Sequence, residues 1–199
     1  METIIGWKDL LYLGSNLIGF LIGLLLIIFG VKKNKANVLI GLAFISITYA
    51  VFTAYLVDSG LYIDFPQFYR TGNLIAYLFA PFTYLYIRQV VENRPVTFYD
   101  FFHLIPFLLF LIDFFPIIFM SSLEEKRMLI QSEINDPLLF GYHSQSRFFP
   151  PSFYAIGRTI LIVIYWFFSI RILHYQDKKV RNPNQAFGKE WVIWMKIVS

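Results

Sequence analysis

The sequence predicts an all-α fold, a multi-pass transmembrane helix bundle with five complete spans plus the start of a sixth. Of its 199 residues, 57% are hydrophobic and only 15% are charged, and the mean hydropathy is +0.58. A soluble domain carries about 25% charged residues to cover its core, so this composition favours lipid as the solvent. The apolar runs are continuous rather than alternating, which disfavours a β-barrel. The absence of cysteine excludes a disulfide scaffold and a cysteine-ligated metal site.

Five apolar stretches approach or reach the roughly 20 residues that a helix needs to cross a bilayer. The first is too long for a signal peptide, and it lacks a basic start and a small-residue cleavage site. A further stretch begins at Trp191, and the nine residues to Ser199 are too few to cross, so we expect the chain to be truncated. The expected spans are residues 10–31, 38–57, 74–91, 101–120 and 153–175, with the start of a sixth at residue 191.

Three prolines lie within the expected spans, Pro81 in the third and Pro106 and Pro116 in the fourth. Proline lacks a backbone N–H and its ring clashes with the preceding turn. Each proline is therefore expected to kink its helix unless neighbouring groups compensate. A static kink is favoured over a hinge used in signalling.

The distribution of lysine and arginine predicts the orientation, because cytoplasmic loops carry a basic excess. The loops after spans one, three and five carry nine such residues, and the opposite side carries five. We therefore expect the N-terminus outside and residues 121–150 as a folded or membrane-skimming extracytoplasmic loop, either a ligand lid or a solvated connector. The nine are Lys32, Lys33, Lys35, Arg88, Arg94, Lys178, Lys179, Arg181 and Lys189, and the five are Lys8, Arg70, Lys126, Arg127 and Arg147.

Two charged residues are expected at membrane depth. Asp113 lies about two thirds of the way along the fourth span, and Arg158 lies about six residues into the fifth. A charge at the bilayer centre costs about 2.5–3.5 kcal/mol on insertion scales, so Asp113 should face protein or water. The two spans are neighbours in sequence, which makes an Asp113–Arg158 pair a reasonable hypothesis. A structural ion pair, or an Arg158 that snorkels to the interface, is favoured over a ligand-binding or proton site open to the outside.

Small residues recur every four positions on the first span, at Ser15, Gly19 and Gly23. This spacing lets two helices approach closely. The prediction is helix packing within the same bundle, with a possible homodimer contact as the alternative.

The sequence contains no motif of a known catalytic centre. There is no HExxH, GxSxG, P-loop or glycine-rich dinucleotide motif. Asp113 is the only acid well inside a span, so intramembrane hydrolysis by paired carboxylates lacks a partner. We expect no enzyme activity, no catalytic residue, no metal site and no cofactor.

Two stretches carry a resemblance to a known family. Residues 81–88 read P-x-x-Y-L-Y-x-R, and about a dozen residues later residues 100–109 read D-x-x-H-x-x-P-F-L-L. The pair resembles the membrane region of bacterial AraC-type transcriptional regulators with about seven N-terminal transmembrane helices. The close match covers roughly residues 80–109. Asp100 is expected to be the N-cap of the fourth span, and His103 a hydrogen-bonded residue in its first turn rather than a pH-sensing or catalytic one.

This resemblance implies a location in the bacterial cytoplasmic (inner) membrane and signal sensing as the role. The chain is then the membrane sensor of a transcriptional regulator, with the lipid bilayer as its surroundings and an unknown signal ligand. DNA would be a partner only through a missing C-terminal domain, and a homodimer would suit paired half-sites. The alternatives are the sensor of a histidine kinase or another output, or a small transporter or channel subunit built around Asp113 and Arg158.

Overall fold

The computed structural model describes residues 6–142 and 145–180, and these residues form helices and connecting turns without any strand. The expected fold class, a multi-pass helical bundle, is confirmed. The expected start of a sixth span at Trp191 lies outside the described residues. Within the described part, the segments long and apolar enough to cross a membrane are Trp7–Lys32, Asn37–Asp58, Pro66–Glu92, Phe98–Met120 and Pro151–Tyr175.

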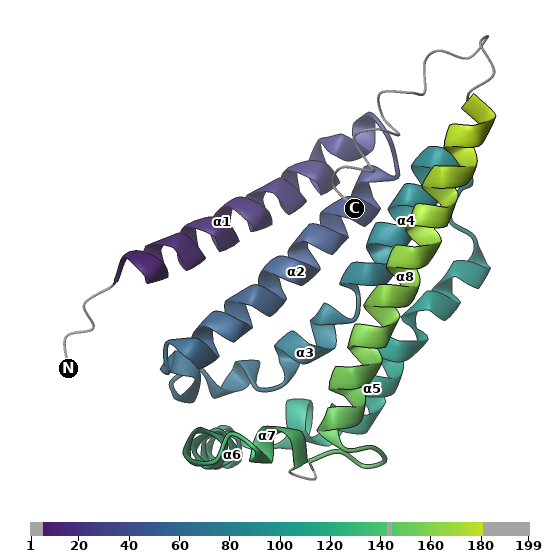
Figure 1. Ribbon diagram of the computed structural model, residues 1–199. Coiled ribbons are helices and arrows are strands. Elements are labelled where there is room, and N and C mark those ends of the chain that lie inside the picture. Colours follow the sequence, from purple (N-terminus) through teal and green to yellow (C-terminus); the bar gives the residue numbers. More distant parts are fainter. Residues whose placement is uncertain (1–5, 143–144, 181–199) are drawn as a thin grey trace.

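The first two spans form an antiparallel hairpin (Figure 1). Helix α1 (Trp7–Ile28) and helix α2 (Asn37–Asp58) are joined through the 3-10 turn η1 (Gly30–Lys32). Their backbones approach closely at Gly23 and Gly41. A Cβ atom on Gly23 would lie 2.8 Å from Ile45 Cγ1 and 3.0 Å from the carbonyl oxygen of Gly41. Glycine is therefore needed on both sides of this contact.

Replacing Gly23 with Ala is expected to destabilise the protein by about 1–3 kcal/mol, because the added methyl group meets backbone that cannot move aside locally. Gly14→Ala is the matched control, since a Cβ atom at Gly14 of the same helix has nothing within 4 Å. Thermal unfolding of both variants in the same detergent measures the difference. Equal stability of the two variants would contradict the close α1–α2 contact.

The third span is broken into pieces. It consists of the 3-10 turn η3 (Pro66–Phe68), helix α3 (Thr71–Ala76) and helix α4 (Phe79–Glu92). Pro81 has no N–H to donate to the carbonyl of Tyr77, and its ring crowds that position. The chain responds with tighter bonds from Tyr77 N–H to the Leu74 carbonyl and from Leu78 N–H to the Ile75 carbonyl. The expected kink at Pro81 is thus a break one turn before it.

The fourth span changes helix type at each of its two prolines. A 3-10 helix, η4 (Phe98–Leu104), leads into α5 (Ile105–Phe115), which has Pro106 in its first turn. The π-helical turn η5 (Pro116–Met120) then closes with a bond from Ser121 N–H to the Pro116 carbonyl, 2.9 Å. Proline is tolerated at these positions because the first residues of a helix need no N–H donor.

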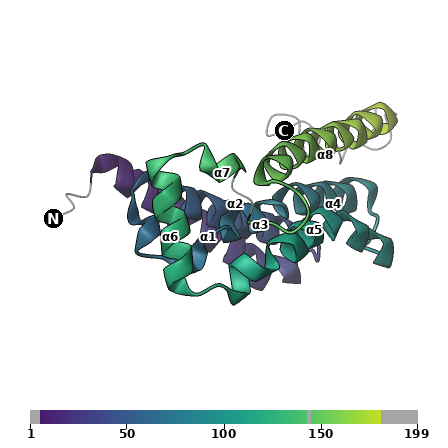
Figure 2. The same cartoon turned by 90° about the horizontal axis from the view of Figure 1, so that it is seen from below.

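Residues 121–142 and 145–150 fold into a cap across one end of the bundle (Figures 1 and 2). Helix α6 (Leu123–Asn135) packs against η3 and the 3-10 turn η2 (Leu61–Ile63), and the short helix α7 (Leu139–Tyr142) follows. Ser122 and Glu125 start α6 with a capping box, since each side chain accepts a hydrogen bond from the other residue's N–H. We call this covered side of the bundle the capped end.

Helix α8 (Pro151–Val180) starts at the capped end, where Tyr154 contacts α5, and runs beside α4 (Figure 1). The buried aromatic core also lies towards this end. Elsewhere the spans expose large apolar side chains, as suits contact with lipid, for example Leu17 of α1 and Val163 of α8. The buried core consists of Leu56, Tyr62, Tyr69, Leu74, Tyr77, Phe110, Phe114, Ile117, Ile118, Ile130 and Tyr154.

Candidate functional site

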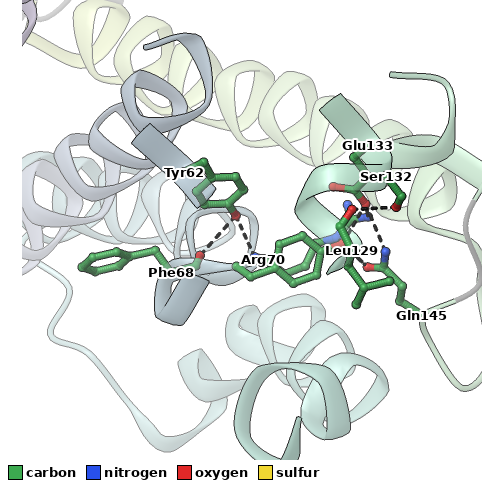
Figure 3. Close-up of polar contacts among 8 residues, drawn as sticks. Tyr62, Phe68, Arg70, Leu129, Ser132, Glu133 and Gln145 are labelled. Atoms are coloured by element: carbon green, nitrogen blue, oxygen red, sulfur yellow. Dashed lines mark hydrogen bonds and ion pairs between the residues drawn. The ribbon is translucent and has the colours of Figure 1, made fainter. Parts of the chain in front are cut away.

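A buried polar cluster joins the cap to the third span (Figure 3). It consists of Tyr69, Arg70, Glu133 and Gln145, which we call the cap cluster. Arg70 Nη2 donates to Glu133 Oε1 at 2.8 Å, and the Tyr69 hydroxyl donates to the same oxygen at 2.7 Å. Gln145 accepts from Arg70 Nε and donates to Glu133. The pairing fixes α6 onto the segment just before α3.

The backbone at Arg70 is left-handed, with φ at 63°. This conformation is uncommon for a residue other than glycine. It is held by Tyr62, whose hydroxyl accepts from the Arg70 N–H at 3.1 Å and donates to the Phe68 carbonyl at 3.3 Å. Burial raises the pKa of Tyr62 to about 12, so the hydroxyl keeps its proton at neutral pH.

A buried lysine gives α6 a second attachment. Lys126 is 4% exposed, and its Nζ donates to the Ile118 carbonyl in the π-helical turn at 2.6 Å. Burial lowers the pKa of this ammonium group. The cap is therefore bonded to both the third and the fourth span.

Asp113 anchors the chain where the cap leads into α8. Its carboxylate is fully buried and accepts from the backbone N–H groups of Arg147, Phe148 and Phe149 at 2.5, 2.7 and 3.1 Å. The Tyr154 hydroxyl donates to it at 2.6 Å. Hydrogen bonds to an ionised acceptor are roughly twice as strong as neutral ones, so this set holds the start of α8 on α5.

Asp113 and Arg158 lie in adjoining sites and have different partners. Arg158 Nη1 donates to Asn73 Oδ1 at 3.1 Å. Among the described residues, the ion pairs within 4 Å do not include Asp113 with Arg158. Tyr154 connects the two sites, because it bonds Asp113 and also lines the pocket that contains Arg158.

This pocket lies between α3, α5 and α8 at the capped end. Its volume is about 40 Å³. A cavity needs about 10–15 Å³ for one water molecule, so the space suits a small polar group rather than a ring system. The lining residues are Arg70, Asn73, Tyr77, Phe110, Phe114, Pro151, Tyr154, Ala155 and Arg158.

A third cluster lies at the opposite end, within the stretches that carry the resemblance. Arg88 and Asp100 form a two-pronged ion pair with N–O distances of 2.5 and 2.7 Å, and both side chains are 6% exposed. The N-cap of η4 is Thr97 rather than Asp100, and Asp100 accepts from the Thr97 N–H at 2.6 Å. His103 Nδ1 shares a 2.7 Å hydrogen bond with the Tyr165 hydroxyl of α8.

Gly19 and Gly23 face α2 of the same chain. A Cβ atom on Gly19 would lie 2.6 Å from Thr48 Oγ1, and the contact of Gly23 is described above. Ser15 is exposed, and its hydroxyl donates to the Tyr12 carbonyl at 3.0 Å. The surface at Gly19 and Gly23 is thus occupied by α2 and is not available to a second copy.

The Arg70–Glu133 and Arg88–Asp100 pairs were not predicted from the sequence. Arg70 and Arg88 were counted there as loop charges. Each arginine directly follows aromatic and apolar residues and lies near one end of the third span. That position is the feature of the sequence that could have indicated a buried role. Comparisons with family models, curated proteins and solved structures find no match.

Proposed function

We propose that this chain is the membrane-embedded sensor of a membrane-bound transcriptional regulator whose DNA-binding domain lies beyond these residues. The resemblance over residues 80–109 supports this reading. The observation that carries it is the double attachment of α8 to the fourth span. Tyr154 bonds Asp113 at the capped end, and eleven residues further along α8, roughly 16 Å, Tyr165 bonds His103.

Helix α8 is therefore the element that could transmit a signal. Tyr154 in its first turn donates to Asp113, and the N–H groups of residues 147–149, just before α8, donate to the same carboxylate. Its other end carries Lys178 and Lys179. In our proposal, a signal that shifts the cap alters the hold on α8, and α8 passes the change to the far side of the membrane.

The proposed orientation places the capped end outside a bacterial cytoplasmic membrane. Arg70 and Arg88 are neutralised by buried partners, so they contribute little to the charge difference between the two faces. Without them the count of basic residues is eight against four, which still favours the capped end outside.

A transporter or channel built on Asp113 has less support. The carboxylate is 0% exposed and accepts four hydrogen bonds from the protein itself, so a passing ion would have to displace them. Removing such partners from a buried charge costs several kcal/mol. The contacts of α8 equally support a sensor with a different output, such as a histidine kinase. The experiment below distinguishes that output from DNA binding.

To test the proposal, the tagged full-length protein is expressed in its own cell. The DNA sites that it binds are mapped, and transcript levels are measured in the same cells. We expect discrete bound sites, and we expect Tyr154→Phe to change transcription near them at an unchanged membrane level. A hydrogen bond to a charged group contributes about 1.5–3 kcal/mol, so its loss shifts a two-state equilibrium about tenfold or more.

Tyr175→Phe is the matched control, because it removes a hydroxyl from a tyrosine of the same helix that is 65% exposed. An absence of bound DNA would contradict the regulator proposal. Phosphorylation of the full-length protein by ATP would instead identify a kinase output.

A further inference from the structure

The pocket at the capped end has a basic lining without an acidic side chain. Arg70 and Arg158 contribute its charges, Asn73 contributes an amide, and the remaining lining residues are aromatic or apolar apart from tyrosine hydroxyls. Glu133 neutralises Arg70 through the cap cluster. The charge balance of the pocket therefore depends on Arg158.

Arg158 has a neutral partner at membrane depth. It lies seven residues after the start of α8, roughly 10 Å along the helix, inside the segment Pro151–Tyr175. Asn73 accepts one of the five N–H donors of its guanidinium group. No described carboxylate lies within 4 Å of it, and a charge at this depth is costly without a counter-charge.

The nearby carboxylates are already engaged. Asp113 is saturated by three backbone N–H groups and Tyr154, and Glu133 is held by Tyr69, Arg70 and Gln145. Neither can turn to Arg158 without breaking its own buried cluster. No carboxylate of the residues that the structure describes is therefore left to pair with Arg158, and an anion bound from outside would supply the opposite charge.

We propose that this pocket binds an oxyanion, the carboxylate or phosphate group of a membrane amphiphile, with Arg158 as its main contact. Guanidinium groups bind both anions through paired hydrogen bonds. The pocket has room for a headgroup and not for a hydrocarbon chain. Ala155, at the pocket wall, and Ile156, beside it on α8, are both exposed, and Ile156 is 62% exposed, so a chain attached to the headgroup can lie in lipid along α8.

This inference rests on the proposed sensor function only in taking the oxyanion as the signal. Binding of an anion between α3, α5 and α8 would act on Tyr154, which lines the pocket and holds Asp113. An anion in the pocket would therefore act directly on the Tyr154–Asp113 hydrogen bond that attaches α8 to α5.

The test measures binding to the purified chain in neutral detergent by anion-dependent thermal shift and by titration. The probes are dodecyl phosphate and laurate, with dodecanol as the uncharged amphiphile and inorganic phosphate and acetate as the free anions. We expect the charged amphiphiles to bind and dodecanol to give no shift. Arg158→Gln should weaken binding about 10- to 100-fold, because it removes a charge-assisted pair of hydrogen bonds.

Two further variants keep the test decisive. Ala155→Phe fills the pocket without changing its charge and should abolish binding, even if Arg158→Gln fails to fold. Arg147→Gln removes an exposed positive charge at the same end and should leave binding unchanged. Tighter binding of dodecyl phosphate than of inorganic phosphate would support the site and show that its anion belongs to a lipid. Equal binding of the two would support the site with a free anion from the water as its ligand.

Failure of every anion to bind, or an equal loss in Arg147→Gln and Arg158→Gln, would overturn the oxyanion site. Because binding is measured without transcription, that result would leave the sensor proposal to its own test. Conversely, binding without any bound DNA in the cell would retain the site and remove the regulator.

Discussion

Asp100→Asn is expected to destabilise the protein by about 3–5 kcal/mol, since breaking a buried ion pair leaves an uncompensated charge. Arg88 would lose the carboxylate that faces both of its terminal nitrogens, while its side chain would remain only 6% exposed. Its Nε already lacks a hydrogen-bond partner. Asparagine keeps an acceptor for the Thr97 N–H, so the loss reports on the charge pair rather than on the helix cap.

Thermal unfolding in detergent measures this effect, with Asp64→Asn as the matched control. Asp64 is an exposed acid at the end of η2, and surface substitutions of this kind change stability by about 0.5 kcal/mol or less. The double variant Arg88→Met with Asp100→Asn should recover much of the loss because it removes the stranded charge. No recovery would show that the pair itself is not the source of the effect.

Glu133→Gln is expected to have a similarly large effect, about 3–5 kcal/mol, but concentrated on the cap. The change keeps the shape of the side chain and removes the charge that faces Arg70. While α6 stays in place Arg70 cannot reach water, because it is 2% exposed and its backbone is held by Tyr62. We therefore expect α6 to detach while the spans remain folded.

Limited proteolysis between α5 and α8, together with hydrogen exchange of α6, measures this detachment. Glu124→Gln is the matched control on the same helix, since the Glu124 side chain is 75% exposed and its contact with Arg127 is 3.8 Å long. An exposed pair of this kind contributes about 0–1 kcal/mol. Equal protection of α6 in the two variants would contradict the role given to the cap cluster.

The positions of the spans could be predicted from the sequence because lipid imposes a length and a composition on each of them. The expected 38–57 and 101–120 agree with Asn37–Asp58 and Phe98–Met120 within a few residues. The third differs most. Residues 66–73 belong to its helical segment although they include Arg70, because Glu133 of the cap neutralises that arginine from 63 residues away. A hydropathy profile averages residues that are neighbours in sequence, so it cannot account for a partner that is distant in sequence.

The environment of Asp113 shows a second limit. The sequence required a partner for a buried carboxylate, and an opposite charge was the obvious choice. The actual donors are the Tyr154 hydroxyl and three backbone N–H groups, and the backbone donors cannot be recognised from any residue type. Pro150 lies just before α8 and Pro151 is its first residue, so the N–H groups of residues 147–149 have no helical acceptor and converge on one carboxylate.

The same environment has a consequence for the order of biosynthesis. Tyr154 follows Asp113 by 41 residues, and at about 5–20 residues per second it is synthesised roughly 2–8 s later. The fourth span therefore reaches the translocon before the donors of its carboxylate are available, and an unpaired charge inside a span is costly to insert. We therefore expect stable residence of that span to depend on residues 147–154, which satisfy the carboxylate only after the end of the cap has been synthesised.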